Sequence, residues 1–135
     1  MGTRAVRVSL DWVGDRRFSA ESGDIRLILD SDAAAGPSPV QTLAFSLAGC
    51  IGIDLVHILT RGRHALTGVS LLLEGDRADD EPRRLIRVRL HVRVTGNVPI
   101  DAVERALRLS REKYCSVWHS MRQGIDLTTT CEVVA

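Results

Sequence analysis

Hydrophobic and polar residues alternate at the start of the chain. The apolar members of this first run are Val6, Val8, Leu10 and Trp12. A period of two residues is typical of a strand with one buried face. Turn residues at 14–15 and 22–24 separate this run from two further short runs at 17–21 and 25–29. The pattern therefore predicts three short strands in the first part of the chain.

A long helix is predicted next. Ser38 is a favourable N-cap, Pro39 suits the first helical position, and Gln41 stands three residues after the cap. The apolar sequence that follows continues to about Thr60, and Gly62 is suited to the position that ends a helix. These signals predict one helix of about six turns in the centre of the chain.

The second half of the chain is predicted to contain both strands and helices. We expect strands at 68–75 and 85–94, a helix starting at 99–101 and broken near Lys113, a short helix at 116–122 and a strand at 125–134. Asp101 and Glu104 have the spacing of a capping box. The order βββ-α-ββ-αα-β predicts a single α+β domain over residues 1–135, with mostly antiparallel strands and a long central helix.

The polar side chains of the long helix fall on one narrow stripe at about 100° per residue. They are Ser46, Cys50, Asp54, His57 and Arg61. Most of the remaining circumference is apolar, and such a helix must be covered on nearly all sides. One small sheet covers a single side, so we expect a second copy of the chain to cover another, giving a homodimer. Gly49 and Gly52 are expected to allow close packing against this helix.

Composition and charge disfavour some partners. The 135 residues carry a net charge of +1, which favours neither nucleic acid nor an anionic membrane as a partner. The apolar stretch at 43–59 is shorter than the roughly 20 residues that span a bilayer, and it contains Asp54. The first residues, 1–4, lead into no apolar signal segment. We therefore expect a cytoplasmic protein.

Three cysteines are the candidate reactive groups. Their wide spacing forms no local redox motif, so any dithiol site must be assembled by the fold. Cys50 lies in the polar stripe, although a free cysteine there could equally be a small buried hydrophobic residue. Cys115 lies at a predicted helix junction close to Lys113, where free N–H groups and positive charge would stabilise a thiolate. Cys131 is expected to be a core residue of the last strand.

Two other groups of polar residues have less specific interpretations. Cys50, Asp54 and His57 have ligand types on one helix face, but their spacing matches no strong metal signature, so we expect neither metal nor cofactor. A row of basic residues in the strand at 85–94 could bind an anion. These residues are Arg87, Arg89, His91 and Arg93. We expect instead a solvated face paired with acids such as Glu74 and Asp76.

Two separated segments resemble the OsmC-like family. The first is Gly-Pro-Ser-Pro at 36–39, followed by 43–50, which ends in Gly-Cys, and Asp-Leu-Val at 54–56. The second is Glu-Lys-Tyr-Cys-Ser-Val at 112–117, and the hairpin at 75–96 between them is similar in layout. The resemblance implies an OsmC-like fold and an intertwined homodimer in which Cys50 and Cys115 face each other at the subunit interface.

The resemblance also implies a thiol-dependent peroxidase. Cys50 would attack an organic hydroperoxide, Cys115 would resolve the sulfenic acid as a disulfide, and a thiol reductant would restore both. Peroxidase members activate the first cysteine with an Arg–Glu pair, whereas this chain has Val40 and Gln41 in the region of the Glu. Arg17 or Arg26 could replace the missing cation. The alternative is a non-catalytic protein that binds a small apolar ligand at the dimer interface.

Overall fold

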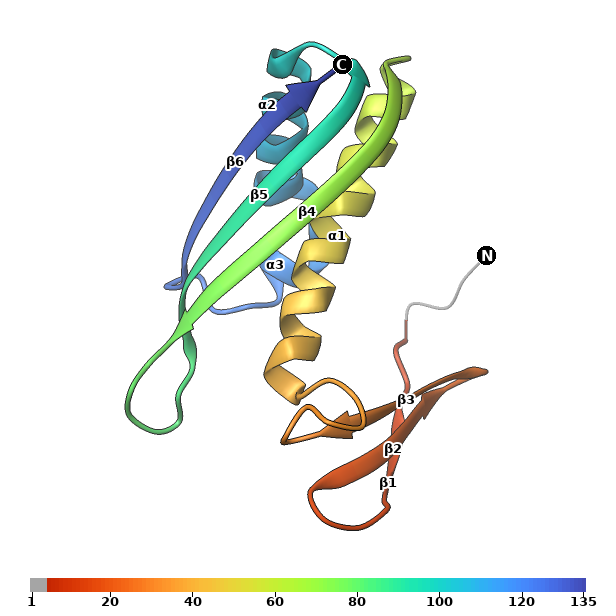
Figure 1. The fold of residues 1–135 in the computed structure, drawn as a ribbon, viewed down its shortest axis with the longest axis vertical. Coiled ribbons are helices and arrows are strands. Elements are labelled where there is room, and N and C mark those ends of the chain that lie inside the picture. The colour runs from red at the N-terminus through yellow and green to blue at the C-terminus, as the bar shows by residue number, and fades with distance from the viewer. Residues whose placement is uncertain (1–4) are drawn as a thin grey trace. The chain divides into compact units, whose positions relative to one another are not determined.

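The computed structural model describes residues 5–135 and shows two compact units, which meet in the chain between Leu43 and Ala44. Residues 1–4, part of the start from which we expect no signal segment, lie outside the described range. The elements are β1 (Ser9–Trp12), β2 (Arg17–Ser22), β3 (Ile25–Asp30), α1 (Pro39–Arg61), β4 (Ala65–Arg77), β5 (Leu85–Asn97), α2 (Ile100–Leu109), η1 (Ser110–Tyr114), α3 (Ser116–His119) and β6 (Asp126–Val134) (Figure 1). This order confirms the predicted α+β class. The single domain expected over 1–135 stays a prediction.

The first unit is a three-stranded antiparallel sheet in the order β1-β2-β3. The tight turn between β1 and β2 contains Gly14 and Asp15, both at positive φ. The carboxylate of Asp30, which is 1% exposed, accepts hydrogen bonds from three backbone N–H groups of the following loop and from Arg17. These bonds hold the pKa of Asp30 well below its usual range, the backbone N–H of Ala35 contributing most. Hydrogen bonds to the buried carboxylate of Asp30 therefore order the loop before α1.

Helix α1 begins as the sequence predicts. The Gln41 N–H donates to Ser38 Oγ over 3.2 Å, and the Ser38 N–H donates to Gln41 Oε1 over 2.9 Å, which is a complete capping box. The helix ends at Arg61, but the left-handed residue after it is Arg63 and not Gly62. The His64 N–H reaches back to the carbonyl of Leu59 over 3.0 Å and closes this end.

The second unit is a three-stranded sheet in the order β4-β5-β6, with α1 and α2 running along one side of it (Figure 1). Strands β4 and β5 are antiparallel, and β6 runs parallel to β5. The core between sheet and helices is formed by apolar side chains, each 5% exposed or less. From α1 they are Leu47, Ile51, Leu55 and Leu59; from β5, Val88, Leu90, Val92 and Val94; from α2, Val103, Ala106 and Leu107.

The outward face of β5 is basic, as predicted. Arg87 and Arg89 both bond to the carboxylate of Asp76, at 3.0 and 2.9 Å, and these bonds lower the pKa of Asp76 to about 2. His91 lies 3.0 Å from Glu132, which also pairs with Arg93. The three arginines and His91 have acidic partners on β4 and β6, so this face is a solvated, paired surface.

The close packing expected at two glycines was confirmed at one of them, and a predicted helix cap was wrong. A Cβ atom at Gly52 would lie 3.1 Å from Leu71 Cδ1, which confirms a close approach of β4 to α1, but nothing lies within 4 Å of such an atom at Gly49. Helix α2 begins after Pro99 without a side-chain cap, so the capping box expected from Asp101 and Glu104 is wrong. Pro99 has no N–H group that needs a partner, and its ring fixes the backbone φ at the start of the helix.

By length and composition alone, α1 could cross a membrane. Core helices of globular proteins pass the same test. Four large side chains of α1 are buried against the second sheet, and Asp54 on the same helix accepts a hydrogen bond from the segment before Cys115. We therefore interpret α1 as a core helix.

Candidate dithiol site

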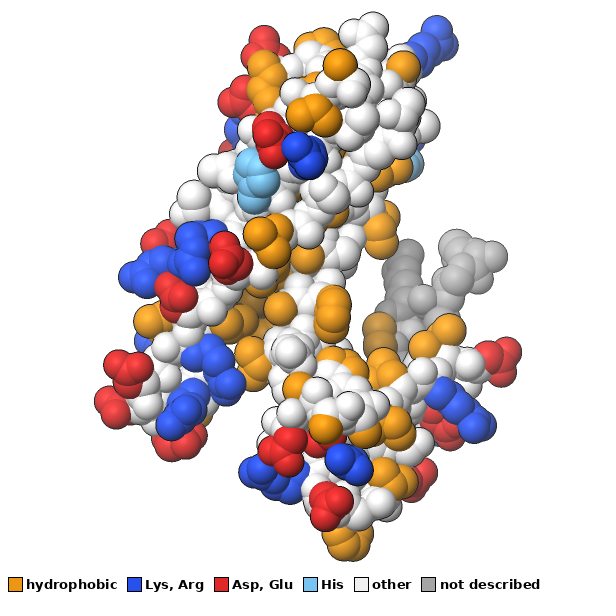
Figure 2. Space-filling model, in the orientation of Figure 1, with side chains coloured by type: hydrophobic (Ala, Val, Ile, Leu, Met, Phe, Trp, Pro, Cys, Tyr) orange, Lys and Arg blue, Asp and Glu red, His pale blue; other side chains and the backbone are white. Residues whose placement is uncertain are grey.

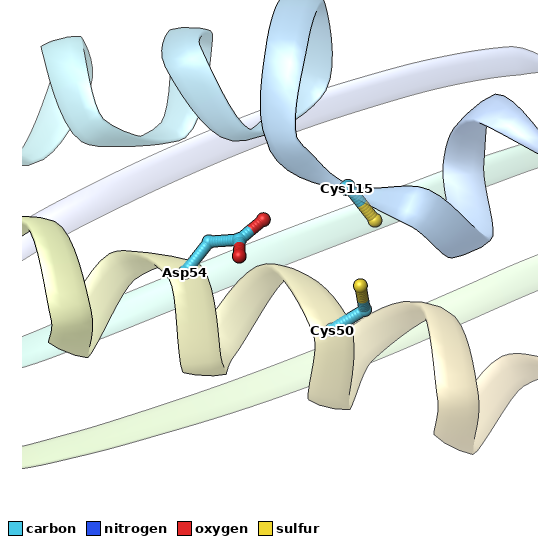
Figure 3. A group of neighbouring side chains, drawn as sticks. All are labelled: Cys50, Asp54 and Cys115. Carbon is cyan, nitrogen blue, oxygen red and sulfur yellow. The ribbon is translucent and has the colours of Figure 1, made fainter. Parts of the chain in front are cut away.

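The segment that carries Cys115 departs from regular helix. After α2 the chain makes one π-helical turn, η1, and Cys115 is extended, with φ −72° and ψ 99°. The Cys115 N–H donates to the carbonyl of Ser110 over 2.7 Å, and Cys115 Sγ accepts the N–H of Trp118 over 3.3 Å as the cap of α3. The helix break predicted near Lys113 therefore lies at Cys115, whose side chain is turned towards α1 (Figure 3).

Cys50 and Cys115 lie together in the folded chain. Figure 3 shows their sulfurs facing each other across the gap between α1 and the segment before α3, with the carboxylate of Asp54 beside them. The two sulfurs and an oxygen of Asp54 all lie within 4.8 Å of one another. Cys50 and Asp54 are half-buried, whereas Cys115 is 0% exposed. One chain is therefore sufficient to assemble the group.

Sequence analysis missed two hydroxyl residues at this site: Ser116, whose Oγ lies 3.9 Å from Cys50 Sγ, and Ser110. The Ser110 hydroxyl donates a 2.7 Å hydrogen bond to Asp54 Oδ2, and the residue is completely buried. By helical spacing, Ser110 continues the apolar stripe that Val103, Ala106 and Leu107 form on α2. A polar residue at an otherwise apolar position was the available signal, because a buried hydroxyl needs a partner.

The thiol of Cys115 is harder to ionise than the sequence led us to expect. The pKa of Cys115 is raised to about 11, mainly by burial and also by the neighbouring Cys50, against the lowering effect of the Trp118 and Val117 N–H groups. The predicted helix cap is present, but desolvation of the charged form outweighs it. The ammonium group of Lys113, which we expected to help, lies over the ring of Tyr114 at 5.4 Å.

The polar stripe of α1 divides into two parts. Cys50 and Asp54 belong to the dithiol site, whereas His57 and Arg61 line a neighbouring groove of about 620 Å³. Asp54 lines both, and Arg105 and Tyr114 form part of the opposite wall of the groove. The sulfur pair therefore adjoins a groove with cationic and hydrogen-bonding side chains.

Cys131 stands apart from this group. It is half-buried in β6 and packs against the hydrophobic core, as predicted. Burial raises its pKa, and the nearby carboxylate of Glu104 raises it further. Cys131 therefore packs as a structural residue, and its thiol is harder to ionise than that of a free cysteine.

The candidates for the family's activating pair have partners within the first unit. Arg17 pairs with Asp30 at 3.0 Å, and Arg26 pairs with Glu21 at 3.3 Å. The side chain of Gln41 is used in the cap of α1. The replacement of the Arg–Glu pair by Arg17 or Arg26 thus stays a hypothesis.

Comparisons with known proteins agree with this architecture. Protein YhfA of Escherichia coli strain K12 is 34% identical over 133 residues, which cover 96% of this chain and 99% of the relative. A hypothetical protein from Aquifex aeolicus has the same fold, with a TM-score of 0.90, 26% identity and 97% coverage of both chains. An organic hydroperoxide resistance protein, OsmC, from Legionella pneumophila is 18% identical with a TM-score of 0.72 and covers both chains fully, which shows a shared fold. The sequence pattern described as OsmC-like protein matches residues 30–130, and the chain therefore belongs to the OsmC-like family.

Proposed function

We propose that this protein is a thiol-dependent organic hydroperoxide reductase that cycles Cys50 and Cys115 between dithiol and disulfide. The observation that carries the proposal is the distance between the two sulfurs, which is no more than 4.8 Å. A disulfide needs about 2.05 Å, a difference that side-chain rotation and small backbone shifts can close. The likeness in fold to a protein named for organic hydroperoxide resistance supports the choice of oxidant.

Exposure and acidity support a different role for each cysteine. Cys50 is half-buried and can be reached by a small molecule, whereas Cys115 is completely buried and, with its pKa raised to about 11, is protonated at neutral pH. A protonated, buried thiol is a poor first nucleophile. Cys50 is therefore the peroxidatic residue and Cys115 the resolving one.

The proposed cycle balances in two steps. Cys50 sulfur attacks one oxygen of the hydroperoxide, the O–O bond breaks, and the leaving alkoxide takes a proton to become an alcohol. The sulfenic acid on Cys50 is then attacked by Cys115 sulfur, which loses its proton as hydroxide leaves as water. Two equivalents of an external thiol, or one dithiol, return this disulfide to two thiols and are themselves oxidised to a disulfide.

Asp54 can carry the protons of this cycle. Its carboxylate is the third member of the group and lies within 4.8 Å of both sulfurs. The hydrogen bond from Ser110 occupies Oδ2, which leaves lone pairs on Oδ1 to accept a thiol proton. We propose that Asp54 takes the proton from each cysteine in turn and passes it to the departing oxygen.

The active form is proposed to be a cytoplasmic homodimer. In the single chain, large apolar side chains of α1 are at the surface: Phe45 is 70% exposed and Ile53 is 71% exposed. Figure 2 shows hydrophobic side chains, in orange, at the surface along the middle of the molecule's second unit. Together with Gly49, Val56 and Leu71, Ile53 lines a hollow of about 620 Å³ on α1 and β4. Burial of such a surface by a second copy is favourable, at about 25 cal/mol per Å² of apolar area.

The same apolar hollow favours one alternative function, the binding of a small apolar ligand without redox chemistry. Its walls are mostly apolar side chains of α1 and β4, as ligand pockets commonly are. This alternative predicts that Cys50 is alkylated no faster than an ordinary buried thiol. Rapid alkylation of Cys50 near pH 7 would count against it.

The direct test is oxidation by one equivalent of cumene hydroperoxide under anaerobic conditions. We expect the loss of two free thiols per chain and a disulfide-linked pair of peptides containing Cys50 and Cys115. Cys131→Ser should behave as the parent protein, and Cys115→Ser should stop at a sulfenic acid on Cys50 that dimedone traps. Free thiols left intact by the hydroperoxide would reject the proposal.

A further inference from the structure

We propose that the reduced site binds one Zn²⁺ ion through Cys50 Sγ, Cys115 Sγ and a carboxylate oxygen of Asp54. The three donor atoms lie within 4.8 Å of one another, and two of the three residues are half-buried and the third is buried. This inference uses only the positions of the donors and holds whether or not the protein reduces hydroperoxides.

The spacing of the donors suits a tetrahedral ion. With Zn–S bonds of about 2.3 Å, two thiolates on a tetrahedral zinc are about 3.8 Å apart. The observed upper limit of 4.8 Å therefore requires the sulfurs to approach by no more than about an ångström. Cys50 and Asp54 are one turn apart on α1, so their side chains already share a face of the helix.

The donor types select the metal. Two thiolates and one carboxylate form a mixed soft and hard set that suits Zn²⁺ better than Mg²⁺ or Ca²⁺, which prefer oxygen ligands alone. Three protein ligands leave a fourth position for water. Ser110 supplies the outer support, because its 2.7 Å hydrogen bond to Oδ2 of Asp54 orients the carboxylate.

The structure changes the ligand set that the sequence suggested. Along the helix, Cys50, Asp54 and His57 were the possible donors, and no zinc signature contained them. The fold replaces His57, which lines the neighbouring groove, with Cys115 from another segment. A variant at His57 therefore separates the two ligand sets.

Zinc and oxidation would then exclude each other. Both cysteines bind zinc as thiolates, releasing two protons, and neither sulfur can form the disulfide while it holds the metal. By linkage, zinc should protect both thiols from hydroperoxide, and the disulfide form should not bind zinc. The metal thus offers a way to hold the site in its reduced state.

Competition with a chromophoric chelator tests the proposal on the full-length, fully reduced protein. We expect one Zn²⁺ per chain. Protein oxidised to its Cys50–Cys115 disulfide should bind no zinc. If hydroperoxide does not form that disulfide, protein with both thiols alkylated is the negative control and should bind no zinc either. Cys50→Ser and Cys115→Ser should each weaken binding by more than about 100-fold, and Asp54→Asn by at least about tenfold.

Matched controls decide between ligand sets. Cys131→Ser and His57→Ala should bind zinc as tightly as the parent protein, and circular dichroism should show that every variant is folded. Unchanged affinity in Asp54→Asn or Cys115→Ser would overturn the proposal, as would a large loss in His57→Ala. Because zinc binding is measured without peroxide, the affinity can still be interpreted if the protein proves not to reduce hydroperoxides.

Discussion

Ser110 donates a 2.7 Å hydrogen bond through its hydroxyl to Asp54 on α1, and through its carbonyl it accepts the N–H of Cys115, also at 2.7 Å. One buried residue thereby links the helix that carries Cys50 to the segment that carries Cys115. The π-helical turn begins at Ser110, so the irregular geometry and the link coincide. Isolated π-helical turns are frequent at functional sites.

Replacing Ser110 with Ala should destabilise the protein. The change leaves the half-buried carboxylate of Asp54 without this donor, at a cost of about 1–3 kcal/mol in the free energy of unfolding. Urea denaturation of the reduced protein measures it. Ser120→Ala is the matched control, because it removes an exposed hydroxyl that bonds to the carbonyl of Ser116 and should cost less than about 0.5 kcal/mol. Equal costs for the two variants would contradict the role of Ser110.

The raised pKa of Cys115 predicts a loss of stability at alkaline pH. In the unfolded chain the thiol ionises near its ordinary pKa of about 8.5, whereas in the folded protein it ionises near 11. Between these values the unfolded state binds fewer protons than the folded state, so the free energy of unfolding falls as pH rises. Below about pH 8.5 the thiol is protonated in both states, and its stabilising contribution to the free energy of unfolding is fully present.

The measurement is the urea midpoint as a function of pH for reduced parent protein and for Cys115→Ser. The slope between about pH 8.5 and 11 should be steeper in the parent, because only the parent carries the buried thiol of Cys115. Superimposable pH profiles would show that the thiol of Cys115 is not protected by burial.

Asp54→Asn should slow disulfide formation by about 100-fold at neutral pH. The amide keeps the shape and can accept the hydrogen bond from Ser110, but it cannot take a thiol proton. Stopped-flow mixing with cumene hydroperoxide, followed by acid quench and thiol counting, gives the rate. The deficit should shrink as pH rises, because solvent then removes the thiol proton. A rate unchanged at every pH would exclude Asp54 as the proton carrier.

Ile53→Asp should convert the proposed dimer to monomer. Ile53 is 71% exposed in the single chain and lines the apolar hollow on α1 and β4, and burying a charged side chain there would carry a large desolvation cost. Light scattering after size exclusion measures the mass. Thr128→Asp is the control, since Thr128 is exposed on β6 and pairs in register with Arg89 on the charged face of the sheet. A parent protein that is itself monomeric would refute the dimer.

Local pattern was sufficient for most elements of the fold. The order of strands and helices, the capping box at Ser38 and the buried and paired faces of β5 all follow from interactions between residues close in the chain or from a period of two. Predictions at single positions were less secure. The cap expected at Asp101 is missing and the left-handed residue after α1 is Arg63, because neighbouring structure supplies other ways to satisfy a helix end.

The sequence by itself determined which side chains share a face, including Cys50 and Asp54 on one stripe of α1, because helical and strand periods are properties of the local backbone. Only the tertiary structure decided that Cys115 completes this group, that Ser110 supports it and that His57 lies outside it. It also decided the acidity of Cys115, where burial outweighs the helix cap. Contacts between segments more than fifty residues apart depend on how helices pack on a sheet, and no local period encodes that packing.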